Sequence, residues 1–242
     1  MGTEGIFVEI LPIAEIRCKF SRKFGLPRQS GYAPGLRGTI VFMPEYRIKK
    51  ATEGLESFSH LWIIWGFSEG FASMADTEGE RGWYPAVRPP KLGGNTRVGV
   101  FATRSPNRPN RLALSAVRIE CIRDTDEYGT VIDVSGIDMT DGTPVYDIKP
   151  YIPYSDSIPG AAGGISEDPE AGRLAVEGTA LLGCLSPEDR QAVIECLGND
   201  PRPGYVSDPG RIFTMSYSEY EISFTVDGRT LTVTECAERA DS

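Results

Sequence analysis

The stretch VGVFATRSPNRPNRLALSAVRIEC, residues Val98–Cys121, contains two apolar runs separated by a polar loop. The runs VGVF and LALSAVRIEC carry aliphatic, β-branched and aromatic side chains, which are typical of short β-strands. The loop between them holds three arginines and two prolines and no carboxylate. Because proline fixes φ and removes a backbone donor, this loop is predicted to be pre-ordered, with its guanidinium groups projecting from it.

Similar strand-like segments continue on both sides, separated by clusters of Gly, Pro, Asn and Asp. They occur without long helical patterns between them, which favours a closed or nearly closed β-barrel over a doubly wound sheet. A short helix is expected at ATEGLESF, residues 51–58. The fold class is therefore predicted as mainly β, with a barrel domain over residues 1–157. The predicted strands are GIFVEIL (5–11), RGTIVFM (37–43), HLWIIWGF (60–67), RVGVFAT (97–103), LALSAVRIEC (112–121) and TVIDVSGI (130–137).

A second, smaller unit is predicted after a stretch rich in Gly, Pro, Ser and acidic residues. We place the linker at residues 158–172 and a small α+β domain at residues 173–242. Its helix has Ser186 as N-cap and ends at Gly198. Its hairpin, residues 220–235, is predicted to turn at Asp227 and Gly228 in type I′ geometry. The proline-rich loop between helix and hairpin is open to two interpretations, a lid or a plain connector.

Composition limits the chemistry that the chain can perform. No apolar run approaches the roughly 20 residues that span a bilayer, and no signal peptide is recognisable, so a cytoplasmic protein is expected. The five cysteines are scattered without a CxxC spacing, which indicates neither a disulfide framework nor a zinc site. His60 is the only histidine. A multi-histidine metal site is therefore excluded, and no metal is expected.

Charge is distributed unevenly along the chain. The formal net charge of −9 argues against generic binding to a phosphate backbone. Residues 86–118 nevertheless contain seven basic side chains and no acidic one, and residues 1–50 contain nine basic against four acidic. Two basic segments on an acidic body suggest one positive face for an anionic ligand or RNA. The alternative is a solvated surface on which the charges scatter once the chain folds.

Three polar loops are candidates for a binding site. Guanidinium forks in the arginine loop, residues 102–111, suit carboxylates and phosphates. Acceptors in DMTDGTPVYDIKPY (138–151) suit a ribose diol or a cationic ligand, and Arg28 and Gln29 in KFGLPRQSGYAP (23–34) suit an adenine edge or a carboxylate. Without a P-loop or a GxGxxG, these loops predict a site built from several barrel loops rather than from a Rossmann turn.

Four strings in the chain resemble the TrmO-type tRNA adenine methyltransferases, also called the TsaA-like or YaeB-like family. The resemblance extends over nearly all of residues 5–157, and DPRPGY (200–205) with the final hairpin resembles the C-terminal portion of the family. The chain departs from the family in having Arg111 and Ala113 in RPNRLALS, where RPNPIGLS is common, and WGFSEG in place of FxFH. The departure in RPNRLALS bears on the substrate contacts of the arginine loop. The four strings are KFGLPRQSGYAP (23–34), LESFSHLWIIWGF (55–67), RPPKLGGNTRVGVFATRSPNRPNRLALSAVRI (88–119) and DGTPVYDIKPYIPYSDS (141–157).

The resemblance implies a single-sheeted β-barrel that binds S-adenosylmethionine and acts on tRNA as a homodimer. The implied reaction is methylation of the exocyclic amine of threonylcarbamoyl-adenosine, 3′ of the anticodon in threonine tRNA. The implied cofactor contacts are Pro27, Arg28, Gln29, His60, Leu61, Arg104, Leu114, Asp138, Met139, Thr140, Asp141, Gly142 and Thr143.

Two carboxylates are candidates for catalysis. An exocyclic adenine amine is a poor nucleophile, so an acceptor near its proton would help. Asp138 and Asp141 fit this role, but they could equally orient the ribose or the cationic centre of the cofactor. The candidates for substrate binding are Arg108, Asn110, Arg111, Lys149, Arg202 and Tyr205.

Two other function classes remain open from the sequence. One is a non-catalytic module that senses S-adenosylmethionine or binds RNA. The other is a small-molecule methyltransferase built on the same barrel, which the basic segments disfavour.

Overall fold

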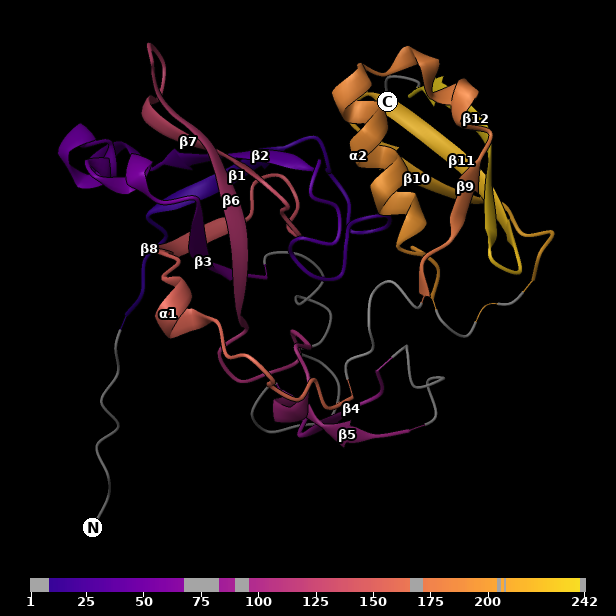
Figure 1. The fold of residues 1–242 in the computed structure, drawn as a ribbon, viewed down its shortest axis with the longest axis horizontal. Helices are drawn as coiled ribbons and strands as arrows, with labels where there is room; N and C mark the ends of the chain where they lie inside the picture. The colour runs from indigo at the N-terminus through magenta and orange to yellow at the C-terminus, as the bar shows by residue number, and fades with distance from the viewer. Residues whose placement is uncertain are drawn as a thin grey trace.

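The computed structural model describes residues 9–67, 83–89, 96–165, 172–203, 206 and 208–239. Figure 1 shows two units side by side: a β-barrel formed by the first part of the chain, and a sheet covered by a helix, formed by the last part. Among the described residues, no helix has the length and apolar character needed to cross a membrane.

The first unit is a closed barrel of six antiparallel strands, in the order β1-β2-β7-β6-β3-β8. The prediction of a mainly β fold with a barrel and a small α+β unit is confirmed. The strands are β1 (Ala14–Cys18), β2 (Arg37–Phe42), β3 (His60–Gly66), β6 (Leu112–Thr125), β7 (Gly129–Ser135) and β8 (Pro144–Pro150).

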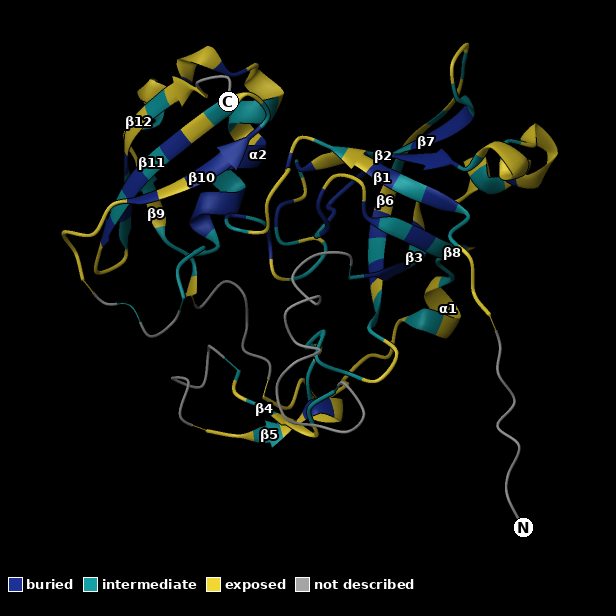
Figure 2. Ribbon diagram, turned by 180° about the vertical axis from the view of Figure 1, so that it is seen from behind, coloured by how far each residue is buried: buried dark blue, intermediate teal, exposed yellow. Residues whose placement is uncertain are grey.

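Every second side chain of β3 points into the barrel and fills its core. In β3, Leu61, Ile63 and Trp65 are buried, whereas the intervening Trp62 and Ile64 are only half-buried. Successive side chains of a strand point to opposite faces, so one face of β3 lines the core. Figure 2 shows the same alternation as dark bands along the barrel strands. Trp65 is thus buried in the barrel core, and Trp62 is only partly covered.

The predicted strands differ from the observed ones in three places. In GIFVEIL, residues 5–8 lie outside the described part of the chain, residues 9–11 form no strand, and β1 begins later, at Ala14. RVGVFAT forms only the two-residue strand β5 (Val98–Gly99), paired outside the barrel with β4 (Ala86–Val87), followed by a 3-10 turn. The sixth barrel strand is instead β8, in a segment interpreted from the sequence as a loop.

The prediction of a helix at residues 51–58 was wrong. Two short 3-10 turns, Lys49–Thr52 and Leu55–Ser57, occupy this region. Gly54 between them has a φ of 89°, in the left-handed region that a continuous helix does not tolerate.

The second unit is a four-stranded sheet, in the order β10-β11-β12-β9, packed against one long helix. The Ser186 hydroxyl accepts a hydrogen bond from the backbone N–H of Asp189 (3.1 Å), which confirms the predicted N-cap. The helix ends at Gly198, as predicted, and Asn199 is its C-cap. The elements are β9 (Ala175–Glu177), a 3-10 helix (Thr179–Cys184), α2 (Pro187–Gly198), β10 (Phe213–Tyr217), β11 (Tyr220–Asp227) and β12 (Thr230–Glu238), and a short helix α1 (Pro153–Asp156) follows the barrel.

The hairpin between β11 and β12 was predicted correctly, but its turn was placed one residue too early. Asp227 pairs with Thr230, so Gly228 and Arg229 are the two central residues. Only Gly228 has a positive φ, of 55°. Glycine at the first central position is the pattern of a type II′ turn rather than of the predicted type I′.

An aromatic seam joins the two units. Phe24, in the loop between β1 and β2, stacks on both Phe213 and Phe224 of the C-terminal sheet, with ring centroids 6.2 Å apart in each case. Phe20 meets Tyr217 edge to face at 5.2 Å. The buried side chains of the barrel and the C-terminal unit therefore form one continuous hydrophobic cluster.

Replacing the ring of Phe224, which is fully buried, tests this seam. Phe224→Ala should lower the free energy of unfolding by about 3–5 kcal/mol, because it leaves a cavity between the units. Phe224→Leu, which fills most of that space, should lose about 1 kcal/mol. Urea unfolding measures both, and a loss below about 1 kcal/mol for the alanine variant would show that the ring does not hold the seam.

Candidate functional site

A central cavity of about 550 Å³ opens at one mouth of the barrel. Two strand segments and three loops supply its walls, as expected for a site assembled from several barrel loops. Its lining residues are Arg28 and Gln29 from the β1–β2 loop, Ile64, Trp65 and Phe67 at the end of β3, Arg104, Pro106 and Arg108 from the arginine loop, Leu112, Ala113, Leu114 and Ser115 at the start of β6, and Asp138 after β7.

The cavity is apolar on the barrel side, and Asp138 is the only carboxylate in its described lining. A chain of hydrogen bonds holds this group: Trp65 Nε1 donates to Ser115 Oγ (2.9 Å), and Ser115 Oγ donates to Asp138 Oδ1 (2.6 Å). The backbone of Ser30 adds a hydrogen bond to the Asp138 carboxylate. Trp65 and Ser115 are buried, so the orientation of the carboxylate is fixed from inside the barrel.

Burial raises the pKa of Asp138 from 3.8 to about 6. The hydrogen bond from Ser115 and the positive charge of Arg104 act in the opposite direction and keep the rise moderate. The carboxyl group therefore changes its charge near neutral pH, which is typical of groups at functional sites.

The arginine loop is tied to the β1–β2 loop across the cavity. Arg104 Nη1 donates a hydrogen bond to Gln29 Oε1. Arg108, by contrast, donates to backbone carbonyls of its own loop, those of Thr103 (2.5 Å) and Ser105 (3.0 Å). Arg108 thus folds the loop, and Arg104 faces the cavity. Arg111 has a φ of 50°, a backbone conformation that a proline could not adopt.

A smaller cavity of about 220 Å³ adjoins the central one and shares Arg28, Trp65, Phe67 and Asp138 with it. Most of the expected cofactor contacts are brought together by these two cavities. They are Pro27, Arg28, Gln29, Arg104, Leu114, Asp138, Met139, Thr140 and Thr143.

Several other expected contacts lie elsewhere. His60 is exposed at the opposite end of β3, where its Nδ1 lies 2.9 Å from Ser59 Oγ, and Leu61 is buried in the core. Asp141, with its neighbour Gly142, lies beside β1: its Oδ1 accepts a hydrogen bond from the backbone N–H of Cys18 (2.9 Å). The structure therefore separates the two candidate catalytic carboxylates.

The expected substrate contacts are also dispersed. Lys149 pairs with Asp147 (2.9 Å) on β8, and Asn110 is exposed in the arginine loop. Tyr205 lies outside the described residues. Neither Lys149 nor Asn110 lines the central cavity.

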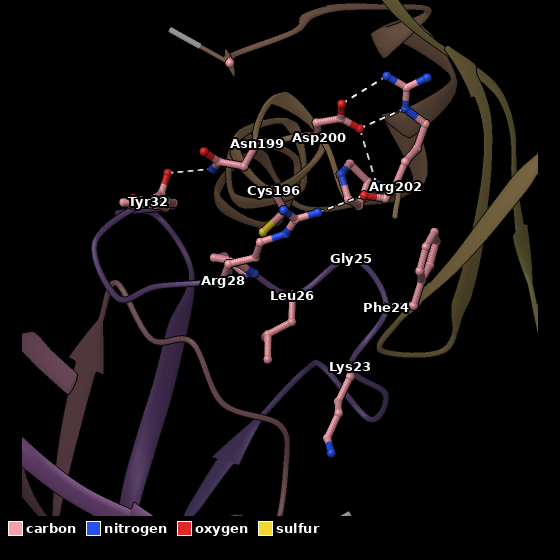
Figure 3. Close-up of a pocket in the computed structure, with 13 residues that line it drawn as sticks. Lys23, Phe24, Gly25, Leu26, Arg28, Tyr32, Cys196, Asn199, Asp200 and Arg202 are labelled. Atoms are coloured by element: carbon pink, nitrogen blue, oxygen red, sulfur yellow. Dashed lines mark hydrogen bonds and ion pairs between the residues drawn. The ribbon is translucent and has the colours of Figure 1, made fainter. Parts of the chain in front are cut away.

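A third cavity, of about 490 Å³, lies at the seam between the units (Figure 3). Arg202 directs its guanidinium to Asp200, with Nε and Nη2 at 2.9 and 3.0 Å from the carboxylate oxygens. The backbone carbonyl of Arg202 accepts a hydrogen bond from Arg28 Nη2 (2.8 Å). Arg28 lines all three cavities: the one at the seam, the smaller one and the central one. Through its hydrogen bond to Arg28, the C-terminal unit therefore positions a residue of the central cavity.

Sequence reasoning missed several residues of the central cavity, above all Trp65 and Ser115. A signal for Ser115 was present, because it is the one hydroxyl in the apolar run LALSAV. Among the described residues, no cluster of three His, Cys, Asp or Glu side chains could hold a metal ion.

The fold and site together define a closed six-stranded β-barrel with a ligand-sized cavity at one mouth and an appended α+β unit. Residues 15–157 match the family domain described as "tRNA-methyltransferase O N-terminal domain", and residues 182–239 match the "TrmO C-terminal domain". The chain therefore belongs to the TrmO family.

Individual relatives cover nearly the whole chain. The Escherichia coli K12 protein named tRNA (adenine(37)-N6)-methyltransferase is 35% identical over 226 residues, which are 88% of this chain and 91% of the relative. A Pseudomonas aeruginosa protein named "Putative S-adenosylmethionine-dependent methyltransferase RcsF" is 42% identical over 84% of this chain and 85% of its own length. A crystal structure of TrmO from P. aeruginosa, 31% identical, superimposes with a TM-score of 0.74 over 98% of this chain and 100% of that one.

Burial of Asp138 predicts a dependence of stability on pH. Because its pKa is raised on folding, the folded protein holds a proton between about pH 4 and 6 that the unfolded chain releases, and the folded state loses stability as pH rises through this window. Asp138→Asn keeps the shape and an acceptor for Ser115 but does not titrate. The variant should therefore be more stable than the wild type by about 2 kcal/mol at pH 8, and nearly equal to it at pH 4.

Chemical denaturation at both pH values measures the difference. Asp126→Asn, which removes an exposed carboxylate from the β6–β7 turn, controls for the change in net charge. A constant difference between wild type and Asp138→Asn across the range would contradict a buried, ionised Asp138.

Proposed function

We propose that this chain methylates N6 of adenosine 37 in tRNA and that the central cavity holds the methyl donor. The observation that carries the proposal is membership of the TrmO family in both parts of the chain. The chain is accordingly an S-adenosylmethionine-dependent tRNA (adenine-N6)-methyltransferase.

The residues of the central cavity are chemically suited to S-adenosylmethionine. The apolar walls of Ile64, Phe67 and Leu112 suit an adenine ring. Arg28 and Arg104 suit the carboxylate of the methionine portion, because guanidinium groups bind carboxylates with two parallel hydrogen bonds. Asp138 suits the ribose hydroxyls or the positively charged sulfur.

When bound, S-adenosylmethionine supplies an electrophilic methyl group on a sulfonium centre. What the chain must add is alignment of donor and acceptor and exclusion of water. The apolar walls serve the second purpose, and the Arg104–Gln29 hydrogen bond serves the first by fixing two loops across the cavity.

Asp138 is the better of the two carboxylates for accepting the amine proton, because it lines the cavity and Asp141 does not. With a pKa of about 6, its carboxylate is a stronger base than that of an ordinary aspartate and is still mainly ionised at pH 7. We therefore assign proton acceptance to Asp138 and a structural role at β1 to Asp141.

The finer features of the reaction belong to the same proposal. A threonylcarbamoyl-adenosine substrate in threonine tRNA is supported by the arginines beside the cavity, since its substituent carries a carboxylate. We also propose a homodimer acting in the cytoplasm, where tRNA is modified. Residues 1–157 would form the catalytic domain and residues 173–242 the C-terminal domain, with residues 158–172 as linker, in keeping with the separate family matches.

The direct test is incubation of the purified chain with labelled S-adenosylmethionine and tRNA, followed by nucleoside analysis. Label in an N6-methylated adenosine supports the proposal, and label in a metabolite extract but not in tRNA contradicts it. Native tRNA and an unmodified transcript, tested side by side, show whether the threonylcarbamoyl group is required.

Arg104→Ala should reduce methyl transfer at least about a hundredfold, because it removes both a cavity charge and the link to Gln29. Its free energy of unfolding should change by no more than about 0.5 kcal/mol, since the side chain is exposed. Arg123→Ala, near the far end of β6, is the matched control and should keep its activity. Full activity of Arg104→Ala would remove this residue from the site.

Affinity for tRNA should depend strongly on salt. If the basic segments contact phosphates, the dissociation constant should rise at least about tenfold between about 50 and 200 mM monovalent salt. Fluorescence anisotropy with labelled tRNA measures this, and an affinity that is independent of salt would argue against a basic contact face.

A further inference from the structure

A fourth cavity, of about 580 Å³, lies beside the central one and is lined by arginines. We call it the arginine cavity. Gln29, Arg104 and Pro106 line both cavities, so the hydrogen bond between Arg104 and Gln29 is part of the wall that separates them. The segments of β4 and β5 supply Arg88 and Arg97, and the arginine loop adds Thr103, Ser105 and Asn107.

The arginine cavity carries a positive charge that the described part of the chain does not neutralise. Three guanidinium groups line it, those of Arg88, Arg97 and Arg104, and no aspartate or glutamate is among its described lining residues. Some arginines elsewhere pair with carboxylates, as Arg123 does with Asp133 (2.5 Å) and Arg202 with Asp200 (2.9 Å). The three cavity arginines form no such pair with any described carboxylate.

The register of β4 and β5 places two of these exposed arginines just beyond the paired residues. Ala86 pairs with Gly99 and Val87 with Val98, so Arg88 and Arg97 occupy the next opposed position. Like charges directly opposite each other on neighbouring strands destabilise the pairing. An anion between the two guanidinium groups would remove this repulsion.

The loop that presents Arg104 is ordered in advance. Thr103 Oγ1 donates to the Val100 carbonyl (2.8 Å) and accepts from the backbone N–H of Ser105 (3.2 Å). Ser105 Oγ in turn accepts from the backbone N–H of Asn107 (3.2 Å). A loop held in this way loses little entropy when its arginine binds a ligand.

We propose that the arginine cavity binds an anionic group of the RNA substrate while the adenine to be methylated occupies the central cavity. The inference rests on the proposed function and extends it to a second subsite. The shared chemistry is an oxyanion recognised by guanidinium groups. Its source is either a backbone phosphate next to the target adenosine or a carboxylate on a substituent of that base.

The test compares the double variant Arg88→Ala, Arg97→Ala with the double variant Arg229→Ala, Arg239→Ala. The control variant makes the same change in net charge at the two ends of β12, in the C-terminal unit. Affinity for S-adenosylhomocysteine, measured by calorimetry, should be unchanged in both, because neither Arg88 nor Arg97 lines the central cavity. The KM for tRNA should rise about tenfold in the cavity variant alone.

Two substrates distinguish the sources of the anion. A phosphate ligand predicts that KM rises equally on modified tRNA and on an unmodified transcript. It also predicts that the plot of log affinity against log salt concentration becomes shallower. Its negative slope should shrink in magnitude by about one for each phosphate that the variant no longer binds. A carboxylate ligand predicts a rise on modified tRNA only. In either case Arg88→Lys, Arg97→Lys should restore part of the affinity, since the charge returns without the fork.

Equal KM values for the cavity and control variants on both substrates would overturn the arginine cavity as a subsite. Wild-type protein that transfers no methyl group to any tRNA would instead overturn the proposed function, and the inference with it. Wild-type activity, measured first, therefore separates the two failures.

Discussion

The structure depends on one hydrophobic contact, the stacking of Phe24 on Phe213 and Phe224. This contact anchors the β1–β2 loop to the C-terminal sheet, and the loop then supplies Arg28 and Gln29 to the cavities at the barrel mouth. Gly25 shows how close the approach is, because a Cβ at this position would lie 2.7 Å from Met215 Sδ. Without the C-terminal unit, a loop of this length would have no packing partner on that side. The C-terminal unit therefore supports the central cavity from outside, although all of the described lining residues of that cavity come from the barrel unit.

The second determinant is electrostatic. A largely buried position is a poor environment for a carboxylate, and Asp138 is tolerated at the barrel mouth because Trp65 and Ser115 form a hydrogen-bond chain to it and Arg104 lies nearby. The same features support the proposed role of Asp138 as a proton acceptor, since its raised pKa makes its carboxylate more basic and its partners fix its orientation. Three arginines, Arg28, Arg104 and Arg108, line the same cavity as this carboxylate, although the chain as a whole is acidic. Local charge at the barrel mouth, rather than net charge, is what an anionic RNA meets first.

The barrel could be predicted from the sequence because strands such as β2, β3 and β7 are rich in β-branched and aromatic residues and lie between strong turn signals. The strand β8 could not, because Asp147, Lys149 and two terminal prolines give it the composition of a loop, and pairing with β3 and β1 makes it a strand. In RVGVFAT the composition indicated a strand, but the chain leaves the barrel at this point to form the β4–β5 hairpin. Propensity describes each segment alone, and here the tertiary partner decided the outcome.

The site was predictable in part for a similar reason. Loops that carry prolines and arginines were identified as a site, and Arg28, Gln29, Arg104 and Asp138 do meet at one cavity. His60 and Leu61 belong to the same sequence motif as Trp65. Because a strand rises about 3.3 Å per residue, however, the two ends of β3 lie at opposite ends of the barrel. Asp138 and Asp141 are separated by a turn that directs the second carboxylate to β1. Strand direction and strand length decide which residues of a motif line the same cavity, and a short sequence motif does not contain this information.

The central claim is that the methyl donor binds at the barrel mouth, between Trp65, Asp138 and Arg104. A crystal structure of the chain with S-adenosylhomocysteine tests this claim most directly. The account predicts the sulfur of the product in the central cavity, facing Asp138, with the carboxylate of its amino-acid portion near a guanidinium group. Product bound only in the seam cavity or the arginine cavity, with the central cavity empty, would contradict it.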